Sequence, residues 1–225
     1  MRFSSVLDTL AKANKKVFTT YDAAKVMGKP VAYASLMLSR SSDVARIERG
    51  KYFIKGADIY EIASNVLFPS YVSLQAGLQY YGLIDQNIIR YSVIALKRHK
   101  SIAVGKSMIE FVRAKRNLFF GYVSNANSYV ADPEKLFIDC IYFGVSFSLL
   151  EEAIRRANDE GLVKASKIED YAIRFGKKTL VNKLGFLLEG IGVSSTRLLR
   201  YRYQNYVRLR TGSNGISRKW RVVYD

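Results

Sequence analysis

The side chains with the clearest chemical potential in this sequence are its arginines and lysines, and the partner they suit is a polyanion. The chain has 36 basic and 19 acidic residues among 225, a formal net charge of +17. The excess lies in residues 1–56 and 151–225, with a nearly neutral stretch between them. Because charge concentrated in two places produces separate electropositive surfaces, we expect two surfaces that attract nucleic acid first and an acidic partner or a membrane surface second.

The first basic segment combines a short helical stretch with an alternating stretch that follows it. A helix about 10–12 Å across fits the major groove of B-DNA, where the edges of the bases can be distinguished. Basic side chains on a neighbouring turn would hold phosphates or enter the minor groove. The residues that we expect to contact double-stranded DNA are Thr20, Tyr21, Lys29, Pro30, Ala32, Tyr33, Ser35, Leu36, Arg40, Arg46, Arg49 and Lys51.

Three helices are needed to position these residues. Apolar residues at helical spacing predict a first helix that ends before Asn14. Thr20 is expected to cap a second helix over Tyr21–Met27, which Gly28 ends. The third helix is predicted from Pro30, a favoured first helical residue, to Arg40.

The third helix should bury one face and expose the other. At 100° per residue, Val31, Ala34, Met37 and Leu38 share the face that would pack on the rest of the domain. Leu36 then points outward, where it could contact a thymine methyl group. Its apolar character could instead indicate a different helical phase.

A basic hairpin follows the third helix. Residues 44–48 and 51–55 alternate as strands on either side of Arg49-Gly50, where glycine allows the turn. Helix, helix, tight turn, helix and hairpin is the order of a winged helix-turn-helix domain. We therefore expect residues 1–56 to form a winged helix-turn-helix DNA-binding domain.

Residues 57–225 are expected to form a second, mixed α/β domain, so the predicted fold class is α+β. Its strands, rich in β-branched and aromatic residues, predict a small, mostly antiparallel sheet, and helices return towards the C-terminus. The expected helices cover residues 59–68, 71–81, 148–161, 166–176, 178–189 and 195–203, and the expected strands cover residues 88–96, 107–113, 118–122 and 136–143.

The second basic segment lies at the end of the chain. It carries eight basic residues and no acidic one: Arg197, Arg200, Arg202, Arg208, Arg210, Arg218, Lys219 and Arg221. Tyr201, Tyr203, Tyr206 and Trp220 alternate with them. Guanidinium groups suit phosphate and aromatic rings stack on bases, so this segment predicts a second polyanion-binding surface. The alternative is that the aromatic residues belong to a core and the arginines to a solvated face.

Acidic residues offer one possible enzymatic site. Asp132, Glu134 and Asp139 form the densest acidic cluster, and paired carboxylates could hold magnesium in a nucleic-acid-processing enzyme. Pro133 marks a turn in this cluster, which favours surface charges instead. We therefore expect no metal site.

Other motifs give no support for an enzyme. Residues 104–107 resemble the end of a P-loop, but Lys100 stands where that motif needs glycine. Cys140 lies in an apolar stretch predicted as a strand, where it would be a small buried hydrophobic residue. His99 stands among basic residues with no carboxylate nearby in the sequence to orient it. We expect a binding protein with no cofactor, and not an enzyme.

The apolar runs are too short to cross a bilayer, and the first residues lack the uninterrupted apolar stretch of a signal peptide. The single cysteine excludes an internal disulfide, and the single histidine leaves little for a transition-metal site. These observations favour a cytoplasmic protein without a membrane partner.

Four segments of the sequence resemble the AbiEi family, the antitoxin and transcriptional-regulator half of the AbiE abortive-infection toxin–antitoxin systems of phage defence. The first is Arg46-Ile47-Glu48-Arg49-Gly50-Lys51-Tyr52, and the most specific is residues 69–83, which include Tyr80-Tyr81-Gly82-Leu83. Residues 180–189 are similar to a helix of the family's C-terminal domain, and residues 219–223 to its final strand. The heavily basic tail departs from the family pattern.

This resemblance implies a DNA-binding N-terminal domain that represses its own operon, joined to a C-terminal antitoxin domain. It also implies a nucleotidyltransferase-like toxin as the counterpart, opposed in type IV fashion without a stable complex being required. Two other classes of function stay open from the residues alone. One is the metal-dependent enzyme using Asp132, Glu134 and Asp139, and the other is an adaptor whose winged helix binds protein.

Overall fold

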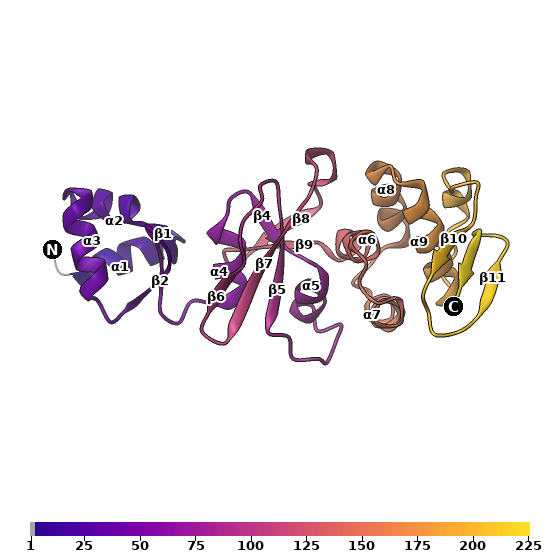
Figure 1. Cartoon of the computed structure of the whole chain (residues 1–225), viewed down its shortest axis with the longest axis horizontal. Coiled ribbons are helices and arrows are strands. Elements are labelled where there is room, and N and C mark those ends of the chain that lie inside the picture. The colour runs from indigo at the N-terminus through magenta and orange to yellow at the C-terminus, as the bar shows by residue number, and fades with distance from the viewer. Residues whose placement is uncertain (1–2) are drawn as a thin grey trace. The chain divides into compact units, whose positions relative to one another are not determined.

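The computed structural model describes residues 3–225, which form a mixed α+β chain with small sheets and a helical segment (Figure 1). The chain divides into two compact units. Unit 1 contains residues 3–72, Ile89–Val112 and Ser124–Tyr129, and unit 2 contains Ser73–Ile88, Arg113–Val123 and Val130–Asp225. The expected domain boundary after residue 56 falls inside unit 1. That residues 1–56 fold independently of the rest stays a prediction.

Unit 1 begins with three helices and a three-stranded antiparallel sheet of order β1-β3-β2. Apolar residues of all these elements pack into one core, which includes Leu10, Phe18, Ala34, Leu38 and Tyr52. The elements are α1 (Phe3–Lys12), β1 (Val17–Thr19), α2 (Thr20–Met27), α3 (Val31–Arg40), β2 (Val44–Glu48) and β3 (Lys51–Ile54). The predicted helices and strands of this segment are thus confirmed to within a few residues, while strand β1 was not predicted.

Helix α2 shows why the local prediction succeeded and where it slipped by one residue. Thr19, not Thr20, is the N-cap: its hydroxyl accepts a hydrogen bond from the Asp22 amide, and the Asp22 carboxylate accepts one from the Thr19 amide. The reciprocal pair satisfies two amides that would otherwise lack partners. Gly28 ends the helix with φ of 61°, in the left-handed region that favours glycine.

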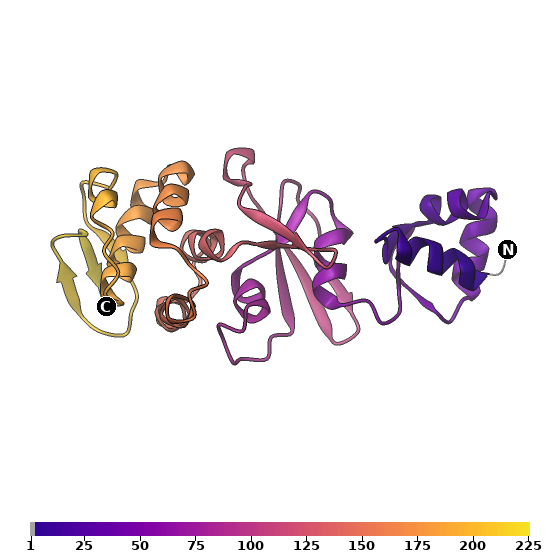
Figure 2. The ribbon, with the colours of Figure 1, turned by 180° about the vertical axis from the view of Figure 1, so that it is seen from behind.

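The remainder of unit 1 centres on a six-stranded sheet of order β6-β7-β5-β4-β9-β8, with α4 packed on β4 and β5 (Figure 2). The β4–β5 and β6–β7 pairs are antiparallel. The elements are α4 (Ile59–Val66), β4 (Ser70–Val72), β5 (Arg90–Ala95), β6 (Ile102–Val104), β7 (Ser107–Arg113), β8 (Tyr122–Asn125) and β9 (Ser128–Ala131).

Unit 2 is mainly helical and ends in a three-stranded sheet. In this sheet the central strand β12 pairs parallel with β10 and antiparallel with β11. Trp220 lies before β12 and is buried, with its ring against Gly185 of α9. The elements are α5 (Leu74–Tyr80), η1 (Arg116–Leu118), α6 (Pro133–Phe143), α7 (Phe147–Asp159), α8 (Ala165–Phe175), α9 (Lys178–Gly190), η2 (Thr196–Arg200), β10 (Val207–Leu209), β11 (Gly215–Ser217) and β12 (Val222–Tyr224).

The strand predicted over residues 136–143 is wrong, because this segment is part of helix α6. Asp132 caps the helix by accepting a hydrogen bond from the Lys135 amide at 2.9 Å, and Pro133 is its first residue. Gly144, with φ of 84°, ends it. The capping signals at both ends decide the structure here, against the strand preference of the β-branched and aromatic residues between them.

Three smaller predictions also need correction. Residues 70–72 form strand β4 in the sheet, so the helix expected from Tyr71 begins only at Leu74. The strand expected over 118–122 is replaced by η1 and the start of β8, and the helix expected over 195–203 is the short η2. Within residues 3–225, no helix combines the length and apolar character that crossing a membrane requires.

Candidate nucleic-acid interface

Helix α3 has one buried and one exposed face. Ala34 and Leu38 are buried in the core of the three-helix segment. Tyr33 and Leu36 are 46% and 45% exposed, and the other predicted contact residues of this helix, Ala32, Ser35 and Arg40, are exposed with them. The predicted helical phase is therefore confirmed for Leu36.

Val31 was expected on the buried face of α3, but it is 47% exposed. It is the first residue of the helix, and the helix reaches the core only one turn later, at Ala34. A position at the end of an element can have the right angular phase and still lie beyond the core.

The corner between α2 and α3 exposes further predicted residues. Lys29 and Pro30 are exposed, and Tyr21 on α2 is 68% exposed. The Gly28 amide donates to the Lys25 carbonyl at 3.3 Å, and the Lys29 amide donates to the Ala24 carbonyl at 3.1 Å. These two hydrogen bonds fix the turn. An open pocket at this corner is lined by Tyr21, Ala24, Lys25, Gly28, Lys29, Pro30 and Val31.

The β2–β3 hairpin turns at Gly50, whose φ is 77°. Arg46 and Arg49 are exposed, and the Arg46 guanidinium donates to the Glu48 carbonyl at 3.2 Å. Thr20, in contrast, is buried, and its amide donates to the Gly50 carbonyl at 2.9 Å. Of the predicted contact residues, Thr20 is thus placed to hold the hairpin and not to face a ligand.

Lys51 also has partners within the protein. Its ammonium donates to the Val66 carbonyl at 2.7 Å and lies 2.9 Å from the Glu48 carboxylate. Arg46 and Arg49 therefore remain as the exposed cations of the hairpin's predicted contact set.

His99 has a carboxylate partner, contrary to the sequence prediction. Its Nε2 lies 3.2 Å from Glu48 Oε2, and its Nδ1 lies 2.8 Å from the Lys100 carbonyl oxygen. Partial burial acts to raise the pKa of Glu48, but Lys51 and His99 together hold that pKa below its usual value. No local pattern links residues 48 and 99, so only the fold of unit 1 could bring them together.

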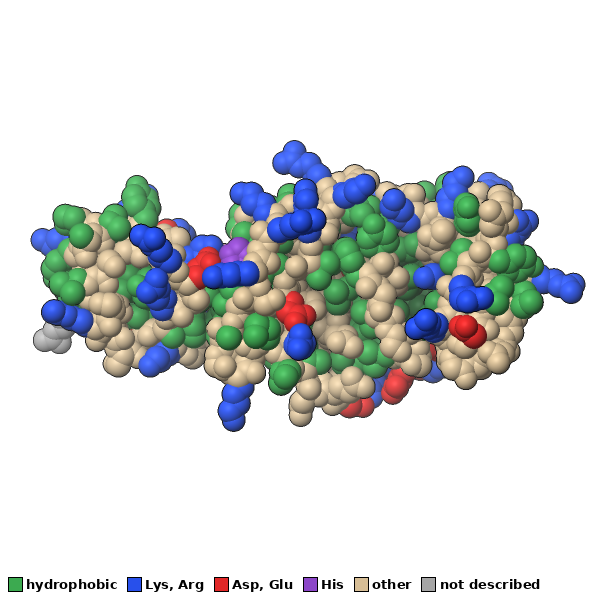
Figure 3. Space-filling model, in the orientation of Figure 1, with side chains coloured by type: hydrophobic (Ala, Val, Ile, Leu, Met, Phe, Trp, Pro, Cys, Tyr) green, Lys and Arg blue, Asp and Glu red, His purple; other side chains and the backbone are tan. Residues whose placement is uncertain are grey.

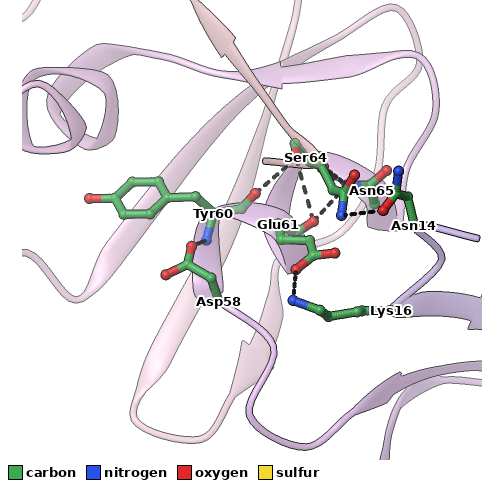
Figure 4. Close-up of polar contacts among 8 residues, drawn as sticks. Asn14, Lys16, Asp58, Tyr60, Glu61, Ser64 and Asn65 are labelled. Atoms are coloured by element: carbon green, nitrogen blue, oxygen red, sulfur yellow. Dashed lines mark hydrogen bonds and ion pairs between the residues drawn. The ribbon is translucent and has the colours of Figure 1, made fainter. Parts of the chain in front are cut away.

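The three-helix segment is tied to α4 by polar contacts, which Figure 4 shows. The Lys16 ammonium lies 3.1 Å from the Glu61 carboxylate, which is buried. The Asn127 amide group donates to the Asn14 side chain at 3.4 Å, and Asn65 donates to the Asn127 carbonyl at 2.8 Å. The helical segment is therefore held against the rest of unit 1 by specific side chains.

Several cations of the second basic segment have partners within the protein. Arg197 lies 2.6 Å from Asp170, and Lys219 lies 2.9 Å from Glu189. Arg202 donates to the Lys219 carbonyl. Arg221 is half-buried, whereas Arg200, Arg208, Arg210 and Arg218 are exposed.

The aromatic residues of that segment divide in the same way. Tyr201, Tyr203 and Tyr206 are exposed, but Trp220 is 1% exposed and its indole N–H donates to Glu189. The core alternative from the sequence is therefore confirmed for Trp220 alone, and the second polyanion-binding surface stays a prediction. A pocket of about 270 Å³ on this unit is lined by Ala172, Ile173, Gly176, Lys177, Lys178, Val181, Arg200 and Tyr201.

The sequence favoured surface charges at a turn for the acidic cluster, and the structure corrects this prediction. Asp132, Glu134 and Asp139 are all buried, on helix α6 or at its N-cap. Lys167 lies 2.7 Å from Glu134 and 3.2 Å from Asp132. The acids can be buried because each has a hydrogen-bonded partner, which offsets the cost of removing a charge from water.

Asp139 forms an ion pair with Lys135, which is itself fully buried, and accepts a hydrogen bond from Ser73 at 3.1 Å. Burial lowers the pKa of Lys135, against the opposing effect of Asp139. Among residues 3–225, no group of acidic, histidine or cysteine side chains has the arrangement of a metal site.

Two further motifs take structural places. Gly105 and Lys106 form the turn between the antiparallel strands β6 and β7, whereas a P-loop joins a strand to a helix. Cys140 is fully buried in helix α6, and burial raises the pKa of its thiol. The predicted burial of Cys140 is confirmed, although it lies in a helix and not in a strand.

No protein-family model matches the chain, and no curated protein matches it. The resemblance to the AbiEi family remains an interpretation of the four segments that carry it.

Proposed function

We propose that the protein is a regulator that binds double-stranded DNA through a winged helix-turn-helix formed by residues 3–54. The order α1-β1-α2-α3-β2-β3, with β3 between β1 and β2, supports this assignment. In such a domain the helix after the tight turn enters the major groove, and the hairpin contacts the backbone beside it.

The observation that carries the proposal is the exposed face of α3, followed in the chain by a hairpin with two exposed arginines. Tyr33, Ser35 and Arg40 offer a ring, a hydroxyl and a guanidinium to base edges, while Ala34 and Leu38 fix the helix from behind. Arg49, beside the turn at Gly50, supplies a phosphate contact that is independent of sequence.

The proposal is tested by fluorescence-anisotropy binding of the full chain to two duplexes of equal length. One carries the DNA immediately upstream of the protein's own gene, and the other a scrambled sequence. We expect preference for the upstream duplex and, for about six neutralised phosphates, a log–log salt slope near −5. Equal affinity for both duplexes at moderate salt would contradict sequence-specific regulation.

Two variants separate reading of bases from gripping of the backbone. Arg40→Ala should reduce the preference for the upstream duplex, by about 1–3 kcal/mol if the guanidinium makes a bidentate base contact. Arg49→Ala should lower the affinity for both duplexes by a similar factor and make the log–log salt slope less steep by about 1. If Arg49→Ala loses the preference and Arg40→Ala keeps it, the hairpin reads the bases and the helix contacts the backbone, contrary to the proposal.

We also propose that this regulator acts in the cytoplasm as the antitoxin of a nucleotidyltransferase-like toxin, with repression of its own operon as the regulatory output. The support is the resemblance of residues 46–52, 69–83, 180–189 and 219–223 to the AbiEi family. Expression of the adjacent reading frame, with and without this chain, tests it. Growth arrest relieved by the chain is expected, and arrest that persists in its presence would overturn this role while leaving DNA binding intact.

A further inference from the structure

The loop between β5 and β6 carries a basic run that the proposed interface does not include. Lys97, Arg98 and Lys100 are exposed, whereas the side chain of His99 is only 18% exposed. The one side chain of this run that turns inward is therefore the imidazole, and the three permanent cations face solvent.

His99 fastens this loop to the hairpin. Its Nε2 lies 3.2 Å from Glu48, and its ring packs edge-on against Phe111 with 4.9 Å between centroids. The other ring nitrogen, Nδ1, lies 2.8 Å from the Lys100 carbonyl oxygen, within the loop itself. Figure 3 shows basic side chains, in blue, spread over the visible face of the molecule with few acidic ones, in red, among them.

The contact between His99 and Glu48 brings two basic segments close together. Glu48 precedes Arg49 at the hairpin turn, and His99 stands between Arg98 and Lys100. Neighbouring Cα atoms are about 3.8 Å apart, so a contact between residues 48 and 99 places the loop cations close to the hairpin. The carboxylate between the two segments is that of Glu48, which Lys51 and His99 already counter.

We propose that the loop 97–100 is a second backbone-binding segment, which contacts DNA phosphates next to those held by the hairpin. This inference rests on the proposed DNA binding and extends the interface beyond residues 3–54. Flexible lysines and one arginine on a loop suit phosphates and carry no base-reading geometry. The loop should therefore add affinity and salt dependence without adding sequence preference.

The test compares the full chain with a variant that carries Lys97→Ala, Arg98→Ala and Lys100→Ala. Affinities for the upstream and scrambled duplexes are measured by fluorescence anisotropy over a series of salt concentrations. For three lost phosphate contacts, the log–log slope should become less steep by about 2–3, and affinity should fall on the order of tenfold or more at low salt. The ratio of the two affinities should not change.

A matched control removes the same charge elsewhere. Lys115, Arg116 and Lys164 are exposed residues of unit 2, and their triple alanine variant has the same loss of two lysines and one arginine. An equal change of slope in this control would show an effect of net charge alone and would overturn the proposal. Thermal unfolding of both variants, and a triple glutamine version of the loop variant, guard against misfolding.

The outcomes separate this inference from the function on which it rests. If the unaltered chain prefers its upstream duplex and the loop variant keeps the full salt slope, the loop proposal fails and DNA recognition stands. If the unaltered chain binds neither duplex, both fail. A smaller slope confined to the loop variant supports the second segment.

Discussion

The two basic regions of this protein both divide their cations between ion pairs and exposed positions, but they place the exposed ones on different elements. In residues 3–54, Arg40 on α3 and Arg46 and Arg49 of the hairpin are exposed, whereas Lys16 and Lys51 have carboxylate partners. In the C-terminal region, Arg197 and Lys219 form ion pairs, while Arg200, Arg208, Arg210 and Arg218 are exposed. A surplus of positive charge in a sequence thus shows that a polyanion will be attracted, but not which side chains remain available to bind it.

The largest expected effect tests the structural role of the C-terminal region. Trp220→Ala removes a ring that is 1% exposed, and we expect a loss of about 3–5 kcal/mol in the free energy of unfolding, measured with denaturant. Tyr206→Ala, at a position 52% exposed, is the control and should change stability by about 0.5 kcal/mol or less. Similar losses in the two variants would show that this division of the aromatic residues is wrong.

The next effect concerns a lysine of the N-terminal region that is used inside the protein. Lys16→Ala leaves the buried Glu61 carboxylate without its ammonium partner, and we expect a loss of about 1–2 kcal/mol. The value is below that for a fully buried pair because the Lys16 side chain is 39% exposed. Lys15→Ala, which breaks the exposed pair with Asp22, should cost about 1 kcal/mol or less. A greater loss for Lys15 would contradict the internal role of Lys16.

A third measurement compares the two regions directly as DNA-binding surfaces. Arg208, Arg210 and Arg218 are exposed C-terminal arginines, and their triple alanine variant should change the salt slope less than the pair Arg46→Ala and Arg49→Ala. The reason is that the hairpin follows α3, whose exposed face is the one proposed to enter a groove. A larger change in the C-terminal variant would move the main DNA-binding surface to unit 2.

The smallest expected effect is a pH dependence of the free energy of unfolding, caused by Glu48 in the hairpin. Because the pKa of Glu48 is lowered in the folded protein, its ionised form contributes stability that is present above the unfolded pKa of about 4.3. That contribution is lost as pH falls through the folded pKa. Unfolding measured between about pH 6 and pH 3 should show a decline that Glu48→Gln reduces, by about 1 kcal/mol or less. Identical pH profiles for the two proteins would contradict it.

Local patterns were enough for much of the N-terminal region. Regular spacing of apolar residues gave helix α3 and its outward Leu36, and Gly28 and Gly50 marked the turns that the structure shows. The same reasoning failed over residues 136–143, where strand-favouring side chains lie in a helix that is capped by Asp132 and ended by Gly144. Propensity is weak compared with capping and burial, so a segment with mixed signals cannot be assigned from its composition.

The sequence by itself determined the net charge, the excess of basic residues at the two ends and the periodicity of α3, because these depend on residue type and near neighbours. Only the tertiary structure decided that Asp132, Glu134 and Asp139 are buried with cationic or hydroxyl partners, and that His99 meets Glu48. Such contacts join residues that are distant in the chain. The energy that favours them comes from burial and from partners that a linear pattern does not contain.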